Sequence, residues 1–598
     1  MRTTSNKKRL SPVAKPTLDR QDVLPASPKA DASSIPAVAV TNLSSSLPVA
    51  STSLIQDASQ YQLDFFQRSI MFFDTLRERA DNMFAHESAG MPPPLDFDYE
   101  TILDARHFDT PANYALLRIT RCRDHFAKEY VGEEKPPVII IDPRAGHGPG
   151  IGGSKHDSEV GISLHEGHPT YFVIFFPLPC ENQTLVHVLK ALRRFADEVA
   201  QRHGGKSPIL YGNCQAGWAA MLLAADCDQL TGPIVLNGSP LSYWSGASGV
   251  NPMRLAGGLM GGMWMTHLLA DQGNGRLDGA WLVQNFESLN PAHTLWEKNY
   301  RLFSKVDTER ERFIEFERWW SGFYFLSRQE ILSIVENLFI GNKLERGKLQ
   351  LSEGCTVDLT RIRSPLIIFA SSEDEITPPH QALNWIPAVY PSTADLIKAG
   401  QRIVYLLNHH VGHLGLFVSA DVAMLEHRAI LESVDEVEAL PPGLYEMKII
   451  NPTGDPDSHK PQYVIGFEER QVEQIQHTFP EKSFENVQRL SEQNEVYYQT
   501  FVSPWVRAFA NPFSAEMLKW LHPMRVSRYL YSEALNPWMV PLKMMVPFVK
   551  ANREPASKDN IFGNAERATS ASIVAALQSY QQSRDAASER LFAKMYGE

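Results

Sequence analysis

Uninterrupted apolar runs recur through the middle of the chain. The first covers residues 138–141 and consists only of Val and Ile, and others follow at 171–176, 209–211, 234–236, 366–369 and 403–407. Runs without polar alternation indicate strands that are buried on both faces, as in a parallel sheet between layers of helices. Segments of helical character lie between these runs, for instance at 184–203 and 216–225. The pattern therefore predicts a doubly wound, mostly parallel α/β sheet.

The stretch between the runs at 234–236 and 366–369 is longer than a simple crossover connection needs. It contains a Gly- and Met-rich segment, residues 257–263, and an aromatic helical segment, residues 313–325, with Trp319 and Trp320 side by side. We expect this stretch to form an inserted cap over the active site, at about residues 240–360.

The regions before and after the apolar runs have a different character. Residues 1–52 are rich in Ser, Pro, Ala and Thr and nearly free of aromatic residues, which predicts a disordered tail. We expect residues 53–130 to form an N-terminal helical segment and residues 131–435 the catalytic α/β domain. Residues 436–598 are then a mainly helical accessory region in which we find no catalytic signature.

Within the N-terminal segment, large apolar residues recur at intervals of three and four positions: Leu63, Phe66, Ile70 and Phe73. This spacing predicts an amphipathic helix with one apolar face. We expect the helix to dock on the main domain. The alternative is an apolar surface that touches a lipid or a polymer granule.

The composition limits the classes of function. The 598 residues carry a net charge of −12, with 43% hydrophobic and 21% charged residues, as in an ordinary soluble globular protein. The acidic balance argues against nucleic-acid binding, which needs a basic face. No apolar run reaches the length of about 18 residues that a transmembrane helix requires, and no signal-peptide core follows the basic first residues. We therefore expect a cytoplasmic protein without a transmembrane segment.

The five cysteines are odd in number and scattered, and no Cys-x-x-Cys pair occurs. Neither a zinc site nor a disulfide framework is therefore expected, and a reducing compartment fits these thiols.

The strongest local signal follows the apolar run at 209–211. There the chain reads Gly212-Asn213-Cys214-Gln215-Ala216-Gly217 and continues into a helical segment. The small residues Gly212, Ala216 and Gly217 allow the sharp strand-to-helix turn that holds a nucleophile in α/β-hydrolases. The amide of Gln215 and the helix dipole favour a thiolate and a developing oxyanion. The pattern predicts Cys214 as the nucleophile; the alternative is a buried cysteine beside a glycine turn.

The partners of an elbow nucleophile follow it in the order acid, then histidine. Asp374 comes just after the run at 366–369, in a segment that prolines fix at residues 378 and 379, and we expect it to orient the imidazole. His413 lies between two glycines after the run at 403–407, which allows its ring to approach the nucleophile. His409 and His410 are adjacent in an extended segment and point to opposite faces, so we do not expect them to share a metal ion.

A glycine-rich loop, residues 142–153, follows the first apolar run. In α/β-hydrolases this position supplies a second amide to the oxyanion hole. Arg144 and Ala145 are the candidate donors. The loop lacks the Gly-Lys-Ser/Thr of a P-loop and the spacing of Gly-x-Gly-x-x-Gly, so nucleotide binding is a weak alternative. No bound cofactor is expected.

These motifs resemble those of the poly(3-hydroxyalkanoate) synthases over about residues 130–420. The elbow departs from their Gly-x-Cys-x-Gly-Gly box only at Ala216, and residues 373–378 and 412–414 resemble their acid and Gly-His segments. Trp319-Trp320 and residues 337–344 also resemble the synthases. From about residue 60, the chain resembles more closely a bacterial family of unknown function, described as poly(3-hydroxyalkanoate) synthetase-like, through residues 142–150 and 238–244.

The resemblance implies an acyltransferase that uses a Cys-His-Asp triad on 3-hydroxyacyl thioesters, with acyl-CoA as the substrate and a covalent acyl-cysteine as the intermediate. One alternative is a Cys-dependent thioesterase or intracellular polyester depolymerase, in which water is the acyl acceptor. Another is a non-catalytic protein that binds a granule or a partner. A polymer granule surface and a homodimer are the partners that we leave open.

Overall fold

The computed structural model describes residues 47–122, 125–126, 131–132, 134–225, 231–352, 355–450, 464–475 and 481–597. The predicted tail, residues 1–52, lies outside the described residues as far as residue 46, and helix α1 (Leu47–Ser88) begins directly after that residue. Residues 57–598 form one compact unit, separate from residues 1–56.

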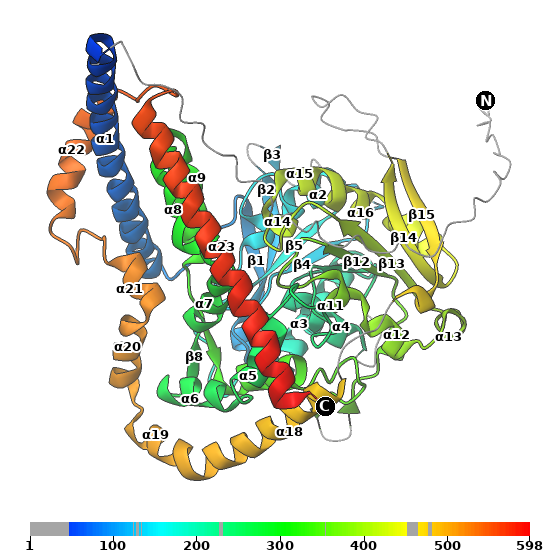
Figure 1. The fold of residues 1–598 in the computed structure, drawn as a ribbon. Coiled ribbons are helices and arrows are strands. Elements are labelled where there is room, and N and C mark those ends of the chain that lie inside the picture. The colour runs from blue at the N-terminus through cyan, green and yellow to red at the C-terminus, as the bar shows by residue number, and fades with distance from the viewer. Residues whose placement is uncertain are drawn as a thin grey trace, which may run out of the picture. The chain divides into compact units, whose positions relative to one another are not determined.

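An eleven-stranded sheet runs through the unit (Figure 1). Its path is β1-β2-β5-β4-β6-β7-β12-β13-β14-β15, and β3 pairs with β2. The strands in chain order are β1 (Asp98–Asp104), β2 (Tyr114–Cys122), β3 (His125–Phe126), β4 (Val138–Ile141), β5 (Thr170–Phe175), β6 (Ile209–Asn213), β7 (Ile234–Asn237), β12 (Leu366–Ser371), β13 (Arg402–Asn408), β14 (Gly443–Ile450) and β15 (Val464–Arg470).

Neighbouring strands are parallel from β5 to β14, whereas the β1–β2, β2–β5 and β14–β15 pairs are antiparallel. Without the short β3, the first eight strands lie in the order 1-2-4-3-5-6-7-8, with the second antiparallel to its neighbours. This is the order of the α/β-hydrolase fold. The predicted fold class is confirmed.

Helices cover both faces of the sheet, which explains why the central strands are apolar throughout. Ile139 and Ile141 of β4 belong to one core with α3 (Leu185–Arg202) and α4 (Gln215–Ala225). Val138 and Ile140 point to the other core, with α2 (Glu159–His165) and α16 (Arg428–Glu432). Shorter helices complete these layers: α11 (Pro379–Leu383), α12 (Trp385–Val389), α13 (Thr393–Lys398), α14 (Gly415–Val418), α15 (Ala420–Val422) and α17 (Val434–Ala439).

The sheet extends beyond the predicted catalytic domain, residues 131–435, at both edges. Strands β1 and β2 lie within residues 53–130, which we expected to be helical, and β14 and β15 lie within the predicted accessory region. The rest of that region is helical, with α18 (Glu481–Tyr497), α19 (Ser503–Phe509), α20 (Pro512–Leu521), α21 (Pro523–Tyr529), α22 (Met539–Ala551) and α23 (Ile561–Tyr596).

A helical insertion separates β7 from β12, where we expected the cap. It contains α5 (Met253–Leu259), α6 (Trp264–Gln272), α7 (Ala280–Leu289), α8 (Lys298–Ser304), α9 (Val306–Trp320) and α10 (Arg328–Ile334), together with the strand pairs β8 (Arg276–Asp278)–β9 (Phe325–Ser327) and β10 (Gln350–Ser352)–β11 (Cys355–Thr356). Helix α23 lies along these helices (Figure 1). Tyr596 of α23 donates a hydrogen bond to the Gly258 carbonyl at 2.7 Å, and Ser570 accepts one from Trp296 at 2.8 Å.

Helix α1 (Leu47–Ser88) is present as predicted, but a different face of it is buried. Of the four residues that predicted the helix, only Ile70 is buried, and Leu63, Phe66 and Phe73 are 40%, 55% and 38% exposed. The buried face combines apolar residues with arginines that form ion pairs with distant elements, as Arg68 does with Glu566 of α23 at 2.8 Å. None of the described helices combines the length and the apolar content that a membrane span needs.

Candidate active site

The chain turns sharply at Cys214, between β6 and α4. The φ angle of Cys214 is +48°, a left-handed conformation that is strained for any residue with a side chain and that marks a nucleophile elbow. The surrounding small residues leave room for this turn: a Cβ atom on Gly217 would lie 1.9 Å from the Ser239 hydroxyl, and one on Gly212 would lie 2.6 Å from the Gly217 Cα. Ala216, where the synthases have glycine, is buried without such a clash.

Asp374, His413 and Cys214 form one hydrogen-bonded line. His413 Nδ1 lies 2.7 Å from Asp374 Oδ2, and His413 Nε2 lies 3.3 Å from Cys214 Sγ. The other carboxylate oxygen of Asp374 accepts hydrogen bonds from the Ile376 and Thr377 amides at 2.8 and 2.7 Å. All three triad residues are buried. The three residues chosen from the sequence therefore meet in space in the order that a Cys-His-Asp triad requires.

The other acids and histidines of these two loops lie outside the buried line. Glu373 and Glu375 are exposed on either side of the buried Asp374. His409 and His410 are also exposed, and His409 contacts the Ser372 hydroxyl at 3.0 Å.

The charge state of His413 depends on opposing effects. Burial lowers the pKa of His413, but the charges and hydrogen bonds of Asp374 and Cys214 raise it, and the net pKa lies well above the ordinary value of 6.5. Asp374 therefore stabilises the imidazolium form that results when the ring accepts the thiol proton.

The loop after β4 contacts the residue that follows the nucleophile. The Arg144 amide donates a hydrogen bond to the side-chain oxygen of Gln215 at 3.3 Å. The Arg144 guanidinium is buried, where Glu330 binds it at 3.1 Å and the Phe325 carbonyl at 3.0 Å, so this part of the loop is fixed in position. Ala145 follows at a half-buried position. The structure thus brings Arg144 next to Gln215, whose own amide begins α4.

A buried polar cluster binds Asn213, the residue directly before the nucleophile, and sequence analysis missed this cluster. Asn213 donates hydrogen bonds from Nδ2 to Glu159 at 2.6 Å and to Asp142 at 3.2 Å, and Asn237 donates to Glu159 at 2.9 Å. Burial raises the pKa of Glu159 to about 8 and that of Asp142 to about 6. A signal was present, since Asp142, Asn213 and Asn237 each stand at the carboxyl end of a parallel strand, where sites gather in α/β sheets.

The cap reaches the glycine-rich loop through two tryptophans. Trp319 Nε1 donates a hydrogen bond to the Gly148 carbonyl at 3.0 Å, and the His147 ring lies 4.2 Å from the Trp319 ring and 5.6 Å from the Trp320 ring, centroid to centroid. Burial lowers the pKa of His147 to about 4, so the ring is neutral at neutral pH. The Trp pair therefore joins the cap to the loop that carries Arg144.

A protein family described as "Protein of unknown function (DUF3141)" matches residues 64–598. The chain belongs to this family. An "Uncharacterized protein in ackA 5'region" of Rhizobium meliloti is 41% identical over 565 residues, which make up 92% of this chain and 76% of the relative. These findings confirm the expected relation to a family of unknown function, and the resemblance to poly(3-hydroxyalkanoate) synthases stays a prediction.

Solved structures are similar at low sequence identity. Puromycin hydrolase is 12% identical with a TM-score of 0.29, and the match covers 58% of this chain and 40% of that chain. The monoacylglycerol lipase of Paleococcus ferrophilus is 15% identical with a TM-score of 0.31, over 51% of this chain and 96% of that chain. Est1E from Butyrivibrio proteoclasticus is 12% identical with a TM-score of 0.31, over 57% of this chain and 99% of that chain. The assignment of the α/β-hydrolase fold rests on the strand order and the elbow, not on these scores.

Proposed function

We propose that this protein is an acyltransferase of the polyhydroxyalkanoate synthase type, with Cys214 as its nucleophile. The observation that carries the proposal is the buried line Asp374–His413–Cys214 at a strained elbow. His413 Nε2 takes the thiol proton, and the Cys214 thiolate attacks the carbonyl carbon of a 3-hydroxyacyl-CoA. The C–S bond to CoA breaks, His413 returns the proton to the CoA thiolate, and the acyl group remains on Cys214.

A second hydroxyacyl group then accepts the acyl chain. His413 removes the proton of its 3-hydroxyl group, the oxygen attacks the acyl-cysteine carbonyl, and the Cys214 thiolate leaves and is reprotonated by His413. The Gln215 amide and an amide of the loop at Arg144 or Ala145 would stabilise the oxyanion in both steps. Asp374 keeps the imidazole in the orientation that both proton transfers need.

The enclosure of the nucleophile supports a hydroxyl acceptor over water. Cys214 is 8% exposed and His413 is 7% exposed, and the cap joins the oxyanion loop through Trp319. Exclusion of water protects an acyl-enzyme from hydrolysis. The alternative is a Cys-dependent thioesterase or intracellular polyester depolymerase, which would use the same triad with water as the acceptor.

Incubation of the full-length protein with 3-hydroxybutyryl-CoA tests the proposal. We expect CoA release, a mass increase of one hydroxybutyryl group on the Cys214 peptide, and a polymeric or oligomeric ester product. The Cys214→Ala variant should show none of these three results. Cys180→Ala, which removes a half-buried thiol away from the elbow, should behave as the wild type. Free 3-hydroxybutyrate as the sole product would replace the proposal by the hydrolase, and an absence of acyl-Cys214 would support a non-catalytic binding protein.

We further propose that the C-terminal helices contact the surface of a polyester granule. Six large apolar side chains between α19 and α22 are 71–80% exposed: Trp505, Phe509, Phe513, Trp538, Met544 and Phe548. Large apolar side chains exposed on several helices of one region are typical of a surface that contacts another apolar phase. Such a phase is the product of the reaction proposed above, which makes the granule the preferred occupant over a lipid bilayer or a second copy of the chain.

Sedimentation with poly(3-hydroxybutyrate) particles tests this contact. The triple variant Trp505→Ser, Phe509→Ser and Phe513→Ser should lose most of the particle-bound fraction. A control variant with Leu295→Ser and Ile397→Ser, which changes exposed apolar residues elsewhere, should retain it. Binding of the wild type to anionic vesicles but not to polyester, or a shift to dimers that the triple variant abolishes, would overturn the assignment.

A further inference from the structure

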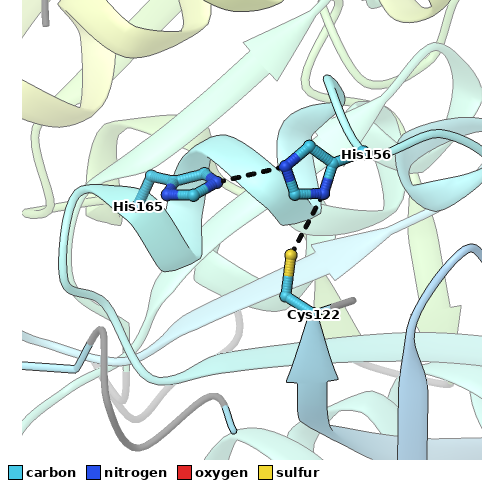
Figure 2. A group of neighbouring side chains, drawn as sticks. All are labelled: Cys122, His156 and His165. Atoms are coloured by element: carbon cyan, nitrogen blue, oxygen red, sulfur yellow. Dashed lines mark hydrogen bonds between the residues drawn. The ribbon is translucent and has the colours of Figure 1, made fainter. Parts of the chain in front are cut away.

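Three potential metal ligands lie close together in the fold (Figure 2). Cys122 is the last residue of β2, His156 lies in the loop before α2, and His165 is the last residue of α2. Cys122 Sγ lies 3.1 Å from His156 Nδ1, and His156 Nε2 lies 3.4 Å from His165 Nε2. One donor atom from each of the three residues lies within 4.8 Å of the others.

The separation of the two Nε2 atoms fits a tetrahedral metal ion. Zinc bonds of about 2.0 Å to nitrogen and about 2.3 Å to sulfur separate two nitrogen ligands by roughly 3.3 Å and a nitrogen from a sulfur ligand by roughly 3.5 Å. The two Nε2 atoms already stand at that separation. Since His156 contacts Cys122 and His165 through different ring nitrogens, a turn of its ring or of the Cys122 side chain completes the convergence on one point.

The three side chains are shielded from solvent to different degrees. Cys122 is buried, and His156 and His165 are half-buried. Arg428, which lies near the site, forms an ion pair with Glu166 at 2.7 Å, so its positive charge is partly offset.

We propose that Cys122, His156 and His165 form a binding site for a divalent transition-metal ion of the zinc class. Metal binding replaces the Cys122 thiol proton, which is released to solvent, and the two imidazoles bind through unprotonated nitrogens. Two histidines and one thiolate leave a fourth position for water or a carboxylate. The site ties the end of β2 to the end of α2.

The position in the fold gives the site a structural role. Helix α2 begins with Glu159, which binds Asn213 directly before the nucleophile, and ends with His165. An ion held at His165 therefore fixes the helix that carries Glu159. Sequence analysis predicted no metal site because no short motif exists: the ligands are separated by 34 and 9 positions and converge only in the fold.

Titration of the metal-depleted, full-length protein with Co²⁺ tests the site. The Cys214→Ala background is used so that the thiol of the triad cannot contribute a cobalt–thiolate signal, and so that the result does not depend on the proposed acyl chemistry. We expect one equivalent of Co²⁺ to give the visible bands of a tetrahedral complex and a near-ultraviolet thiolate-to-cobalt band. Zn²⁺ should displace the cobalt, and its binding should raise the melting temperature above that of the metal-depleted protein.

Three variants in that background make the test specific. Cys122→Ser should lose the thiolate band, His165→Gln should weaken Co²⁺ binding at least tenfold, and Cys180→Ser should bind as its parent. Because His165 is half-buried, His165→Gln should disturb the fold less than a change at the buried Cys122. The His165→Gln result therefore decides the test if Cys122→Ser does not fold. A folded parent protein without a tetrahedral cobalt spectrum, or an unchanged spectrum in His165→Gln, would overturn the proposal.

Discussion

Three histidines follow β13, and only His413 lies in the buried interior beside Cys214. His413→Ala should lower the rate of acyl-Cys214 formation at least about 100-fold, because both nucleophile activation and proton return to the leaving group are lost. His409→Ala and His410→Ala should stay near the wild-type rate, because both side chains are exposed. Rapid-quench mass spectrometry of the Cys214 peptide measures these rates. A wild-type rate for His413→Ala would remove the triad mechanism.

Glu159 gives a pH dependence of stability that is separate from catalysis. Burial, together with the Asp142 charge, raises its pKa from 4.5 to about 8 against the hydrogen bonds from Asn213 and Asn237. Because the folded-state pKa lies above the unfolded one, the stabilising contribution is fully present below about pH 4.5 and is lost as the pH rises to about 8. Within this window, each unit of increase in pH should lower the free energy of unfolding by up to about 1.4 kcal/mol through Glu159.

The Glu159→Gln variant resembles the neutral acid and should remove this pH dependence. Urea unfolding of both proteins at several pH values between about 5 and 8 measures the difference in unfolding free energy. Glu373→Gln, which changes an exposed carboxylate in the acid segment, is the matched control and should follow the wild type. Parallel curves for the wild type and Glu159→Gln would show that Glu159 is ionised in the folded protein.

The residues of the triad could be predicted because each follows a recognisable strand in a fixed chain order. Their supporting residues could not. The partners of Asn213 are Asp142 and Glu159, 71 and 54 positions earlier in the chain, and these pairs follow only from the strand order and the position of α2. The same reason explains why Cys122 and His156 did not suggest a common site.

At the scale of elements, the central strands were predictable and the edge strands were not. Strands β4, β5, β6 and β12 are buried along their whole length and read as continuous apolar runs. In β1, the first four residues are exposed and three of the seven residues are acidic, so the segment lacks the apolar signal of a strand. An edge strand that faces solvent carries such polar residues as protection against unwanted pairing.

Helix α1 shows how an apolar pattern can point to the wrong face. Its buried side includes Arg68, Arg77 and Arg79, which a hydropathy pattern assigns to solvent. Each pairs with an acid far along the chain: Arg68 with Glu566 at 2.8 Å, Arg77 with Glu533 at 2.8 Å and Arg79 with Glu317 at 3.2 Å. A buried charge is tolerated when it is paired, and the partner cannot be identified from the local sequence.

At the scale of the whole molecule, α1 and α23 connect distant parts of the chain to the cap. Arg79 of α1 pairs with Glu317 of α9, two residues before the Trp pair that contacts the glycine-rich loop. Glu317 is fully buried, and although burial raises its pKa, Lys298, Arg528 and Arg79 outweigh that effect and hold the pKa far below its ordinary value. The position of α9 and its Trp pair therefore depends on contacts made by the N-terminal helix.

Two N-terminal truncations test this dependence. Deleting residues 1–52 should leave the melting temperature and thioester turnover unchanged, because the deletion keeps the residues of α1 that bond to other elements, such as Tyr61 with Glu566 and Asp64 with Arg553. Deleting residues 1–88 removes Arg79 and four buried apolar side chains, Ile70, Met71, Leu76 and Met83. Burial of four such side chains contributes on the order of 6–12 kcal/mol, comparable to the whole stability of a typical domain. The longer deletion should therefore aggregate or melt far below the wild type.

The exposed apolar residues of α1 suggest a different result for the same two truncations. Leu63, Phe66 and Phe73 face solvent and would serve a granule contact rather than the core of this chain. If that contact were the main role of α1, the 1–88 deletion would remain soluble and active and would lose only its sedimentation with polyester particles. Thermal melting, CoA release and sedimentation of both truncations separate these outcomes. A loss of turnover on deleting residues 1–52 alone would show that the N-terminal residues contribute to the site in a way that α1 does not explain.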